Sequence, residues 1–470
     1  MTRDETIALW LECEKARNDA RAEGQSEKEA HQAAQVIWNR WANSILHELA
    51  DLKSAGKWDV EYKPDDDWYG VRHIGRNNET TIWLKKALVD FSYLKVDTNQ
   101  KIEQLKFHTV QKYLSADNTV RSPREKLDFE GFIFPSTADF RAVVFLGHAN
   151  FYNTNFHGTA GFRRTYFGGI AEFEQAIFQK AGWFARTIFS DVAHFDLANF
   201  QGMARFASVV FEDDALFSKV KFEKSAYFLQ NIFTKRAVFE ATEFVGEASF
   251  NASKSDSAFV LARSHFHNAP IFNQADFKQA PDLDEVVLPR PAFWKRGNRE
   301  LTSRYRALRR LAVQGHDYER EQQAFVGELR SRRWSVDKWY TAGLWFSLAY
   351  DGISDCGRSI SRPFAAWFSA ILLFGVVYWA LGGFPQICGN SPDHPVKQAF
   401  LISLKNASIG LTTSRDQRIS AAYECVFGGT IDRPAIPFIG TLAEIIVQVP
   451  LSAALIFLFL LAIRNRFKIK

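Results

Sequence analysis

Cysteine is scarce in this sequence. The 470 residues contain four, which are Cys13, Cys356, Cys388 and Cys425. Four widely spaced cysteines do not make a disulfide-rich domain. An excess of charge of one sign is also lacking, because 58 lysines and arginines are balanced by 53 aspartates and glutamates. The resulting net charge of +5 is too small to predict a nucleic-acid partner.

The motifs of common enzyme classes are absent as well. The sequence has no Gly-x-x-x-x-Gly-Lys loop, no dinucleotide fingerprint and no cluster of cysteines and histidines. His265 and His267 would point to one side of a strand, where they could bind a metal, but we interpret them as surface residues. We therefore predict no enzymatic activity, no cofactor and no metal site. The opening residues, MTRDETIALWLECEK, lack a basic start with an apolar run, so we expect no secretory signal.

Phenylalanine, in contrast, is abundant and periodic: the chain contains 43. One series steps by eleven residues from Phe134 to Phe277, and a second does so from Phe129 to Phe272. The two series interleave with spacings of five and six, and only Ser255 and Leu261 replace phenylalanine, without changing the register. No helix or ordinary strand has such a period. A fixed short period predicts a solenoid, in which stacked copies share one core.

The residue two positions before each phenylalanine is usually small or β-branched, as at Ala138 and Thr154. The phrases ADFRAVVF, AEFEQAIF, AHFDLANF and AVFEATEF resemble the pentapeptide-repeat proteins, in a variant with an eleven-residue unit. This resemblance implies a right-handed quadrilateral β-helix over residues 129–280, with two units in each coil and about seven coils. A thin two-sided solenoid with one unit per coil is the alternative.

Residues 1–128 are predicted to form a mainly helical region. Ala33, Ile37, Trp41 and Ile45 recur at helical spacing, and NETTIWLKKALVDF suggests a further helix capped by Asn78 or Thr80. A solenoid needs its ends covered, so we expect this region to cap the first coil. The phrases VIWNRWANSIL and NETTIWL also resemble the leader of some bacterial membrane-anchored pentapeptide-repeat proteins.

Residues 281–362 are predicted to hold a proline-rich linker and then a basic helical hairpin. Leu301, Tyr305, Leu308 and Leu311 mark the apolar stripe of its first helix. The arginines have two interpretations: attraction to anionic lipid, or a solvated face beside a packed stripe. The phrases SRYRALRRLAVQGHDYEREQQAF and SDCGRSISRP resemble the juxtamembrane region of the same family.

Residues 363–470 are predicted to be a membrane domain with two spans. Residues 363–384 and 445–463 carry no charge and are long enough to cross a bilayer. Basic residues flank both spans on their outer sides, which predicts that both termini are cytoplasmic. These are Arg358, Arg362, Arg464, Arg466, Lys468 and Lys470. We expect a multi-pass protein of the bacterial inner membrane, with an external loop at residues 385–435 in which Cys388 and Cys425 could form a disulfide.

The segment VKQAFLISLKNASIGLTT, residues 396–413, lies between the spans. Two spans around a short helix resemble the pore module of two-helix cation channels. The potassium filter Thr-Val-Gly-Tyr-Gly is missing, because the chain has Ser408, Ile409, Gly410 and Leu411 there. The alternative, which we favour, is an interfacial helix on the outer leaflet. Its apolar stripe would be Val396, Phe400, Leu404, Ala407 and Leu411.

The predicted function is that of a membrane-tethered platform for protein interactions. Its partners would be the lipid bilayer and an unknown protein. The alternative is a subunit of a homo-oligomeric ion channel gated by the solenoid. Its pore-lining candidates are Asn406, Ser408, Glu444 and Gln448. A third option, topoisomerase protection by DNA mimicry, requires a continuous acidic stripe.

Overall fold

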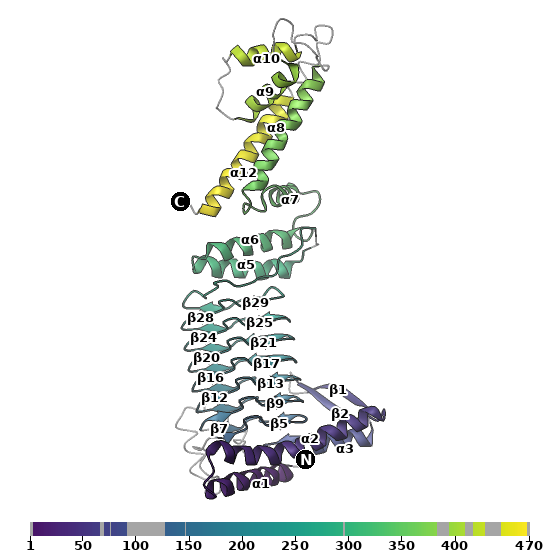
Figure 1. Cartoon of the computed structure of the whole chain (residues 1–470), viewed down its shortest axis with the longest axis vertical. Helices are drawn as coiled ribbons and strands as arrows, with labels where there is room; N and C mark the ends of the chain where they lie inside the picture. Colours follow the sequence, from purple (N-terminus) through teal and green to yellow (C-terminus); the bar gives the residue numbers. More distant parts are fainter. Residues whose placement is uncertain are drawn as a thin grey trace. The chain divides into compact units, whose positions relative to one another are not determined.

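A computed structural model describes residues 3–65, 70–75, 77–91, 127–145, 147–294, 297–382, 394–408, 417–427 and 443–467. The chain divides into two compact units, Met1–Arg332 and Arg333–Lys470. The first unit contains a β-solenoid of about seven turns with helices at each end (Figure 1). The second unit is helical. The predicted mixed fold class is confirmed.

Four parallel sheets of seven strands each form the walls of the solenoid. Sheet 1 comprises β3 (Val89–Asp90), β6 (Ala138–Asp139), β10 (Ala160–Gly161), β14 (Gly182–Trp183), β18 (Ala204–Ala207), β22 (Ala226–Leu229) and β26 (Ala248–Ser249). Sheet 2 comprises β7 (Val144–Phe145), β11 (Tyr166–Phe167), β15 (Ile188–Phe189), β19 (Val210–Phe211), β23 (Ile232–Phe233), β27 (Lys254–Ser255) and β30 (Asp276–Phe277). Sheet 3 comprises β4 (Leu127–Asp128), β8 (Ala149–Asn150), β12 (Ala171–Glu172), β16 (Ala193–His194), β20 (Ala215–Leu216), β24 (Ala237–Val238) and β28 (Phe259–Val260). Sheet 4 comprises β5 (Ile133–Phe134), β9 (Asn155–Phe156), β13 (Ile177–Phe178), β17 (Asn199–Phe200), β21 (Lys221–Phe222), β25 (Glu243–Phe244) and β29 (His265–Phe266).

The register of strand pairing fixes the length of a coil. Ala138 pairs with Ala160, and Phe134 pairs with Phe156. Each strand therefore meets the strand two eleven-residue units later, and one coil has four sides. The two-sided alternative is wrong, because it would pair strands one unit apart.

The core is a set of phenylalanine stacks along the solenoid axis. The rings of Phe140 and Phe162 lie 4.9 Å apart with planes at 1°, and their stack continues to Phe184. The small residues predicted to face inward are buried. Where the small residue is threonine, its hydroxyl donates to a phenylalanine carbonyl in the preceding coil, as from Thr165 to Phe140 at 2.7 Å. The buried hydroxyl groups are thus satisfied within the core.

One corner of every unit adopts a left-handed backbone conformation. Ala142, Asn153 and Arg164 begin a series with φ near +55°, which recurs every eleven residues to Glu285. The Val143 N–H donates to the Phe140 carbonyl at 3.3 Å and closes a turn around Ala142. A positive φ at the third residue is typical of a type II turn. All of these corners from Ala142 on are non-glycine residues, so each is held against its local preference by the stacked coils.

The N-terminal region caps the first coil. It contains α1 (Arg3–Ala22), α2 (Glu27–Ser54), the antiparallel pair β1 (Val60–Asp65) and β2 (Gly70–Gly75), and α3 (Asn78–Ala87). Trp38 of α2 donates from Nε1 to the Ile133 carbonyl at 2.8 Å. Asn39 donates to the Gly131 carbonyl at 3.0 Å and accepts from the Ile133 N–H at 2.9 Å. Helix α2 therefore supplies hydrogen bonds that a preceding strand would otherwise make.

Three details of the N-terminal prediction need correction. The β1–β2 hairpin lies in a region for which the sequence predicts mainly helices. The N-cap of α3 is Asn77, whose Oδ1 accepts from the Thr80 N–H at 2.7 Å. The solenoid also begins before residue 129, because β3 belongs to sheet 1 and Phe91 stacks on Phe140 at 5.0 Å. Val89–Phe91 resembles the Ala-x-Phe pattern with valine in place of alanine, but the number of residues between it and β4 interrupts the period.

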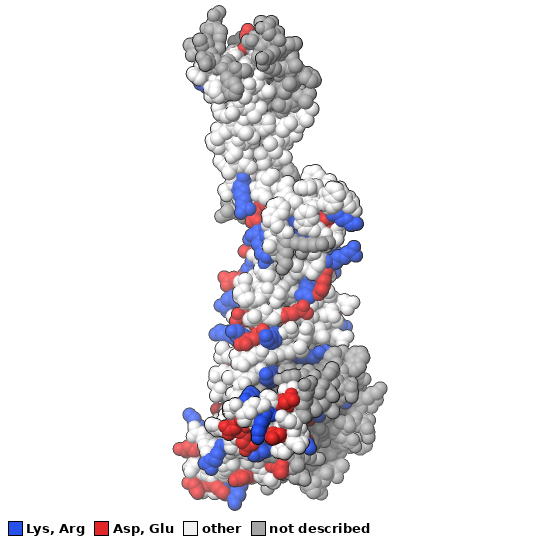
Figure 2. Space-filling view, turned by 90° about the vertical axis from the view of Figure 1, so that its right-hand side faces the viewer, with Lys and Arg blue, Asp and Glu red and all other residues white. Residues whose placement is uncertain are grey.

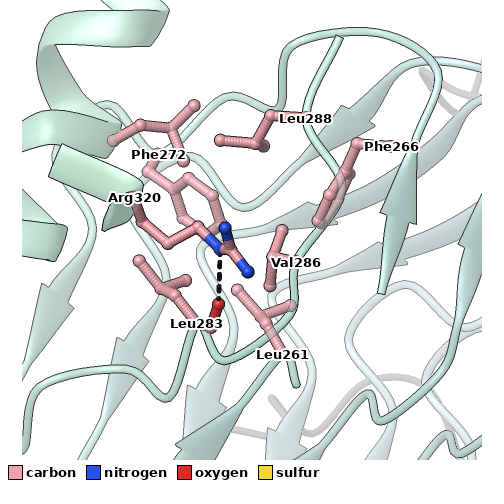
Figure 3. A pocket seen from close by; sticks show the side chains of 8 residues that line it. Leu261, Phe266, Phe272, Leu283, Val286, Leu288 and Arg320 are labelled. Atoms are coloured by element: carbon pink, nitrogen blue, oxygen red, sulfur yellow. Dashed lines mark hydrogen bonds between the residues drawn. The ribbon is translucent and has the colours of Figure 1, made fainter. Parts of the chain in front are cut away.

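The hairpin of α5 (Arg299–Gln314) and α6 (Tyr318–Arg332) caps the opposite end of the solenoid. Tyr305, Leu308 and Leu311 join the phenylalanine core. Figure 3 shows Arg320 among the apolar side chains of the last coil, where its Nε donates to the Leu283 carbonyl at 3.2 Å. The small pocket drawn there lies between the last coil and the hairpin.

Several hairpin arginines form ion pairs within the same unit. Arg304 reaches Glu247 at 2.9 Å, and Arg306 reaches Glu328 at 2.9 Å. These contacts and the packed stripe support the second of the two interpretations, a charged face beside a packed stripe.

The second unit contains α7 (Ala342–Ser354), α8 (Ser361–Leu381), α9 (Pro395–Ala407), α10 (Gln417–Phe427), the π-helical segment η3 (Ala443–Gln448) and α12 (Val449–Phe467). Two helices, Ser361–Leu381 and Ile446–Asn465, are long and apolar enough to cross a membrane. In Figure 2 the surface of these two helices is white along most of its length. Arg333 and Asp351 form a fully buried ion pair at 2.8 Å, which holds the segment before α7 against that helix.

Candidate functional site

A buried polar network links three helical segments of the second unit. Gln448, at the end of η3, donates to the Ser403 carbonyl at 2.9 Å and to its hydroxyl at 2.8 Å. Ser403 of α9 donates to the Ile371 carbonyl of α8 at 2.7 Å. The Tyr378 hydroxyl of α8 donates to Oε1 of Gln448. The side chains of Tyr378, Ser403 and Gln448 are all nearly inaccessible to solvent.

Asn406 completes this network and leaves one atom without a partner. Its Nδ2 donates to the Tyr378 hydroxyl at 3.3 Å, so the structure joins the predicted site residues Asn406 and Gln448 through Tyr378. The Oδ1 of Asn406 and the hydroxyl oxygen of Ser452 on α12 are buried and accept no hydrogen bond from the described residues. Buried acceptors normally have a partner, so these two oxygens are candidate contacts for a water molecule or an ion.

The other predicted site residues are placed differently. Ser408 caps α9: its hydroxyl donates to the Lys405 carbonyl at 3.1 Å. Glu444 lies in η3, but its side chain is outside the described residues. Ile409, Gly410 and Leu411 also lie outside them. Tyr378 has no distinctive signal in the sequence, because a tyrosine at the end of an apolar span is common at a membrane interface.

The predicted apolar stripe of α9 coincides with its buried face only at Ala407. The buried face carries Gln398, Ser403 and Asn406 as well as alanines, whereas Leu404 of the predicted stripe is 47% exposed. The helix packs along α8 and α12, and Trp367 of α8 donates to its Ala407 carbonyl at 3.2 Å. The placement of this helix on the outer leaflet, which we favoured over a pore helix, stays a prediction. The polar side chains of α9 face inward because Tyr378 and Gln448 form hydrogen bonds with Asn406 and Ser403.

The four cysteines fall into two groups. Cys13 and Cys356 are free and buried, and burial raises the pKa of the Cys13 thiol to about 12, so this thiol is unreactive. Cys425 of α10 is disulfide-bonded. Its expected partner, Cys388, lies outside the described residues.

The solenoid carries an apolar stripe on the outside of sheet 2. Strand pairing stacks one outward residue per coil in register. The five consecutive residues are Val144, Tyr166, Ile188, Val210 and Ile232. Ile232 is 42% exposed, Val144, Ile188 and Val210 are partly exposed, and Tyr166 is nearly buried. The column then turns polar with Lys254. This stripe cannot be recognised in the sequence, since its members are twenty-two residues apart.

Charge on the solenoid is mixed. Figure 2 shows acidic and basic side chains interspersed on the face that it draws. Many of them pair across coils, as Lys235 does with Asp213 at 2.6 Å and Arg236 with Asp214 at 2.6 Å. Such a surface differs from the continuous acidic stripe that DNA mimicry requires.

The comparisons with known proteins agree with the repeat register. Residues 184–230 match the family model for pentapeptide repeats, in nine copies. No curated protein and no solved structure matches the chain. Solenoids of this kind are typically structural or interaction proteins rather than enzymes. The chain thus contains pentapeptide repeats, folded as a four-sided β-solenoid.

Proposed function

We propose that the chain is a membrane-tethered interaction protein, in which the solenoid binds a protein partner at the cytoplasmic face of a bacterial inner membrane. The observation that carries this proposal is the outward apolar stripe on sheet 2. The stripe is continuous and partly exposed, and Ile232 is its most exposed member. A contiguous apolar surface that water reaches is typical of a binding surface. Five coils at ~4.8 Å give a stripe roughly 19 Å long, which suits a short helix or strand of a partner.

Three features support residence in a membrane. Helices α8 and α12 have the length and composition of spans. Helix α9 turns polar side chains inward, as helices in lipid do. The segment that leads to α8 exposes large aromatic side chains, and such residues are enriched at the membrane–water interface. These are Trp339, Tyr340, Trp345 and Phe346, all at least 60% exposed.

The orientation rests on charge. Arg358 precedes α8, Arg362 lies in its first turn, and Arg464 lies near the end of α12. Positive residues on the outer flanks of two spans favour a cytoplasmic location for both ends. The bacterial inner membrane comes from the resemblance of the leader and juxtamembrane phrases to bacterial membrane-anchored pentapeptide-repeat proteins.

Site-specific photo-crosslinking in intact membranes tests the interaction surface. A photoreactive amino acid at Ile188 should give a discrete adduct of higher mass. The same residue at Ile177, an isolated outward apolar position on sheet 4, is the matched control and should give none. Val210→Glu should remove the adduct from Ile188, because it places a charge in the stripe. Equal adducts from both sheets would contradict the proposal.

The second candidate function is an oligomeric ion channel, and the unpartnered oxygens of Asn406 and Ser452 favour it. Two spans cannot enclose a water-filled path alone, so this function requires several subunits around an axis. The mass of the complex in detergent and ion flux into liposomes test it together. A ring whose flux changes in Asn406→Leu and Glu444→Ala supports a channel. A strict monomer without flux excludes it and leaves the spans as an anchor.

A further inference from the structure

The solenoid brings two histidines and a carboxylate together on the outside of sheet 4. Glu243 of β25 pairs with His265 of β29 in the parallel register, and His267 follows two residues later. One ligand atom from each of the three side chains lies within 4.8 Å of the others. All three side chains are accessible to solvent. The histidines that the sequence suggested to be separate surface residues thus gain a third ligand from the preceding coil.

The backbone beneath this group is fixed. Phe244 and Phe266 stack at 4.7 Å with planes at 2° in the core. The His265 N–H donates to the Thr242 carbonyl at 2.9 Å, and the His267 N–H donates to the Phe244 carbonyl at 3.0 Å. A metal therefore requires only rotations of three side chains, which lowers the entropic cost of forming the site.

The chemistry of the donors selects the class of ion. Two imidazoles and one carboxylate suit zinc, nickel, copper or iron rather than calcium or magnesium, which prefer oxygen ligands alone. A site with three protein ligands also leaves positions open for water or for a further ligand. Lys221 lies 3.9 Å from Glu243 and opposes a cation, but its side chain is 47% exposed and free to turn away.

The other group of this kind in the described residues is a poorer candidate. It consists of His31, Asp128 and Glu130. His31 Nε2 lies 2.9 Å from the Glu130 carbonyl, and the Arg17 guanidinium lies 3.2 Å from its Nδ1. These contacts join α2 to the first coil, and the guanidinium repels a cation.

We propose that Glu243, His265 and His267 form a binding site for a divalent transition-metal ion, with zinc as the reference ion. The inference is independent of the membrane function, because it rests on the solenoid alone. The site would let a metal join two successive coils, or let a partner that supplies a fourth ligand dock there.

Isothermal titration of the purified full-length chain in detergent with Zn²⁺ tests the site. One ion should bind per chain, and His265→Ala, His267→Ala and Glu243→Gln should each weaken binding by at least about tenfold, or about 1.4 kcal/mol. His148→Ala is the matched control, since His148 contacts only one carboxylate, Glu172, at 2.9 Å among the interactions described. The zinc affinity of His148→Ala should equal that of the unsubstituted chain.

Binding to the solenoid also predicts a spectroscopic result. Co²⁺ bound to imidazole nitrogen should give visible absorption that the His265→Ala/His267→Ala variant lacks, and circular dichroism should show both proteins folded. Unchanged zinc affinity in the folded double variant, or binding lost only in His31→Ala, would overturn the proposal.

Discussion

Phe259 fills the space that Ser255 leaves in the phenylalanine core. Ser255 stands where sheet 2 has Phe233 in one coil and Phe277 in the next. Phe259 stands where sheet 3 has Ala237. Its ring centre lies 5.7 Å from that of Phe233 and 4.7 Å from that of Phe277. A large-to-small change on one wall is thus matched by a small-to-large change on the next, and the core stays full.

This exchange predicts strong coupling between the two positions. Ser255→Phe should overfill the core and destabilise by about 1–3 kcal/mol, and Phe259→Ala should cost about 3–5 kcal/mol through a cavity. The double variant restores the regular repeat and should be far more stable than the sum of the single effects predicts. Unfolding of the full-length chain in detergent, followed by circular dichroism, measures all three. Simple additivity would show that the two side chains do not share one space.

The left-handed corners predict that glycine stabilises the chain at a corner residue. At the residue just before a corner, glycine should destabilise it. Ala241 has φ of +53°, so Ala241→Gly should relieve strain and stabilise by about 0.5–1 kcal/mol. Ala262 precedes the corner residue Arg263 in the next coil and has no positive φ. Ala262→Gly should therefore destabilise by about the same amount. The same sign for both variants would argue against corner strain.

The N-terminal cap predicts a local effect of Asn39. Asn39→Ala removes a donor and an acceptor and leaves Gly131 and Ile133 without those partners, at a cost of about 1–3 kcal/mol. Amide hydrogen exchange should rise first in the coil that contains Ile133. Asn43→Ala, at an exposed position of the same helix, serves as the control. Uniform exchange in both variants would refute the capping role.

Two histidines predict opposite effects of pH on stability. The Asp196 carboxylate, 3.8 Å from the imidazole, raises the pKa of His194 in the folded chain. The stability that this interaction adds to the folded chain is present below about pH 6.5. It is lost as the pH rises through the pKa of His194 in the folded chain. Burial lowers the pKa of His157, so stability is lost as the pH falls below about 6.5.

Glutamine substitutions separate the two effects. His194→Gln should flatten the stability profile above pH 6.5, and His157→Gln should flatten it below. Thermal unfolding across this range, together with NMR titration of both imidazoles, provides the measurement. A His194 midpoint at or below that of His157 would contradict the assignment.

The sequence alone determined the solenoid, because burial of one phenylalanine every five or six residues admits no helix or flat sheet. It also determined the two apolar spans, since length and hydropathy suffice for them. Both are local or strictly periodic properties.

The tertiary structure decided what depends on stacking between distant residues. The strand Val89–Asp90 joined the solenoid across an interruption of the period, and the stripe from Val144 to Ile232 emerged only once coils of twenty-two residues were in register. The inward polar face of α9 likewise depends on Tyr378 and Gln448, which come from other helices. Such contacts have no signature in any short window of sequence, because hydrogen bonds and shared faces are set by the fold that brings the residues together.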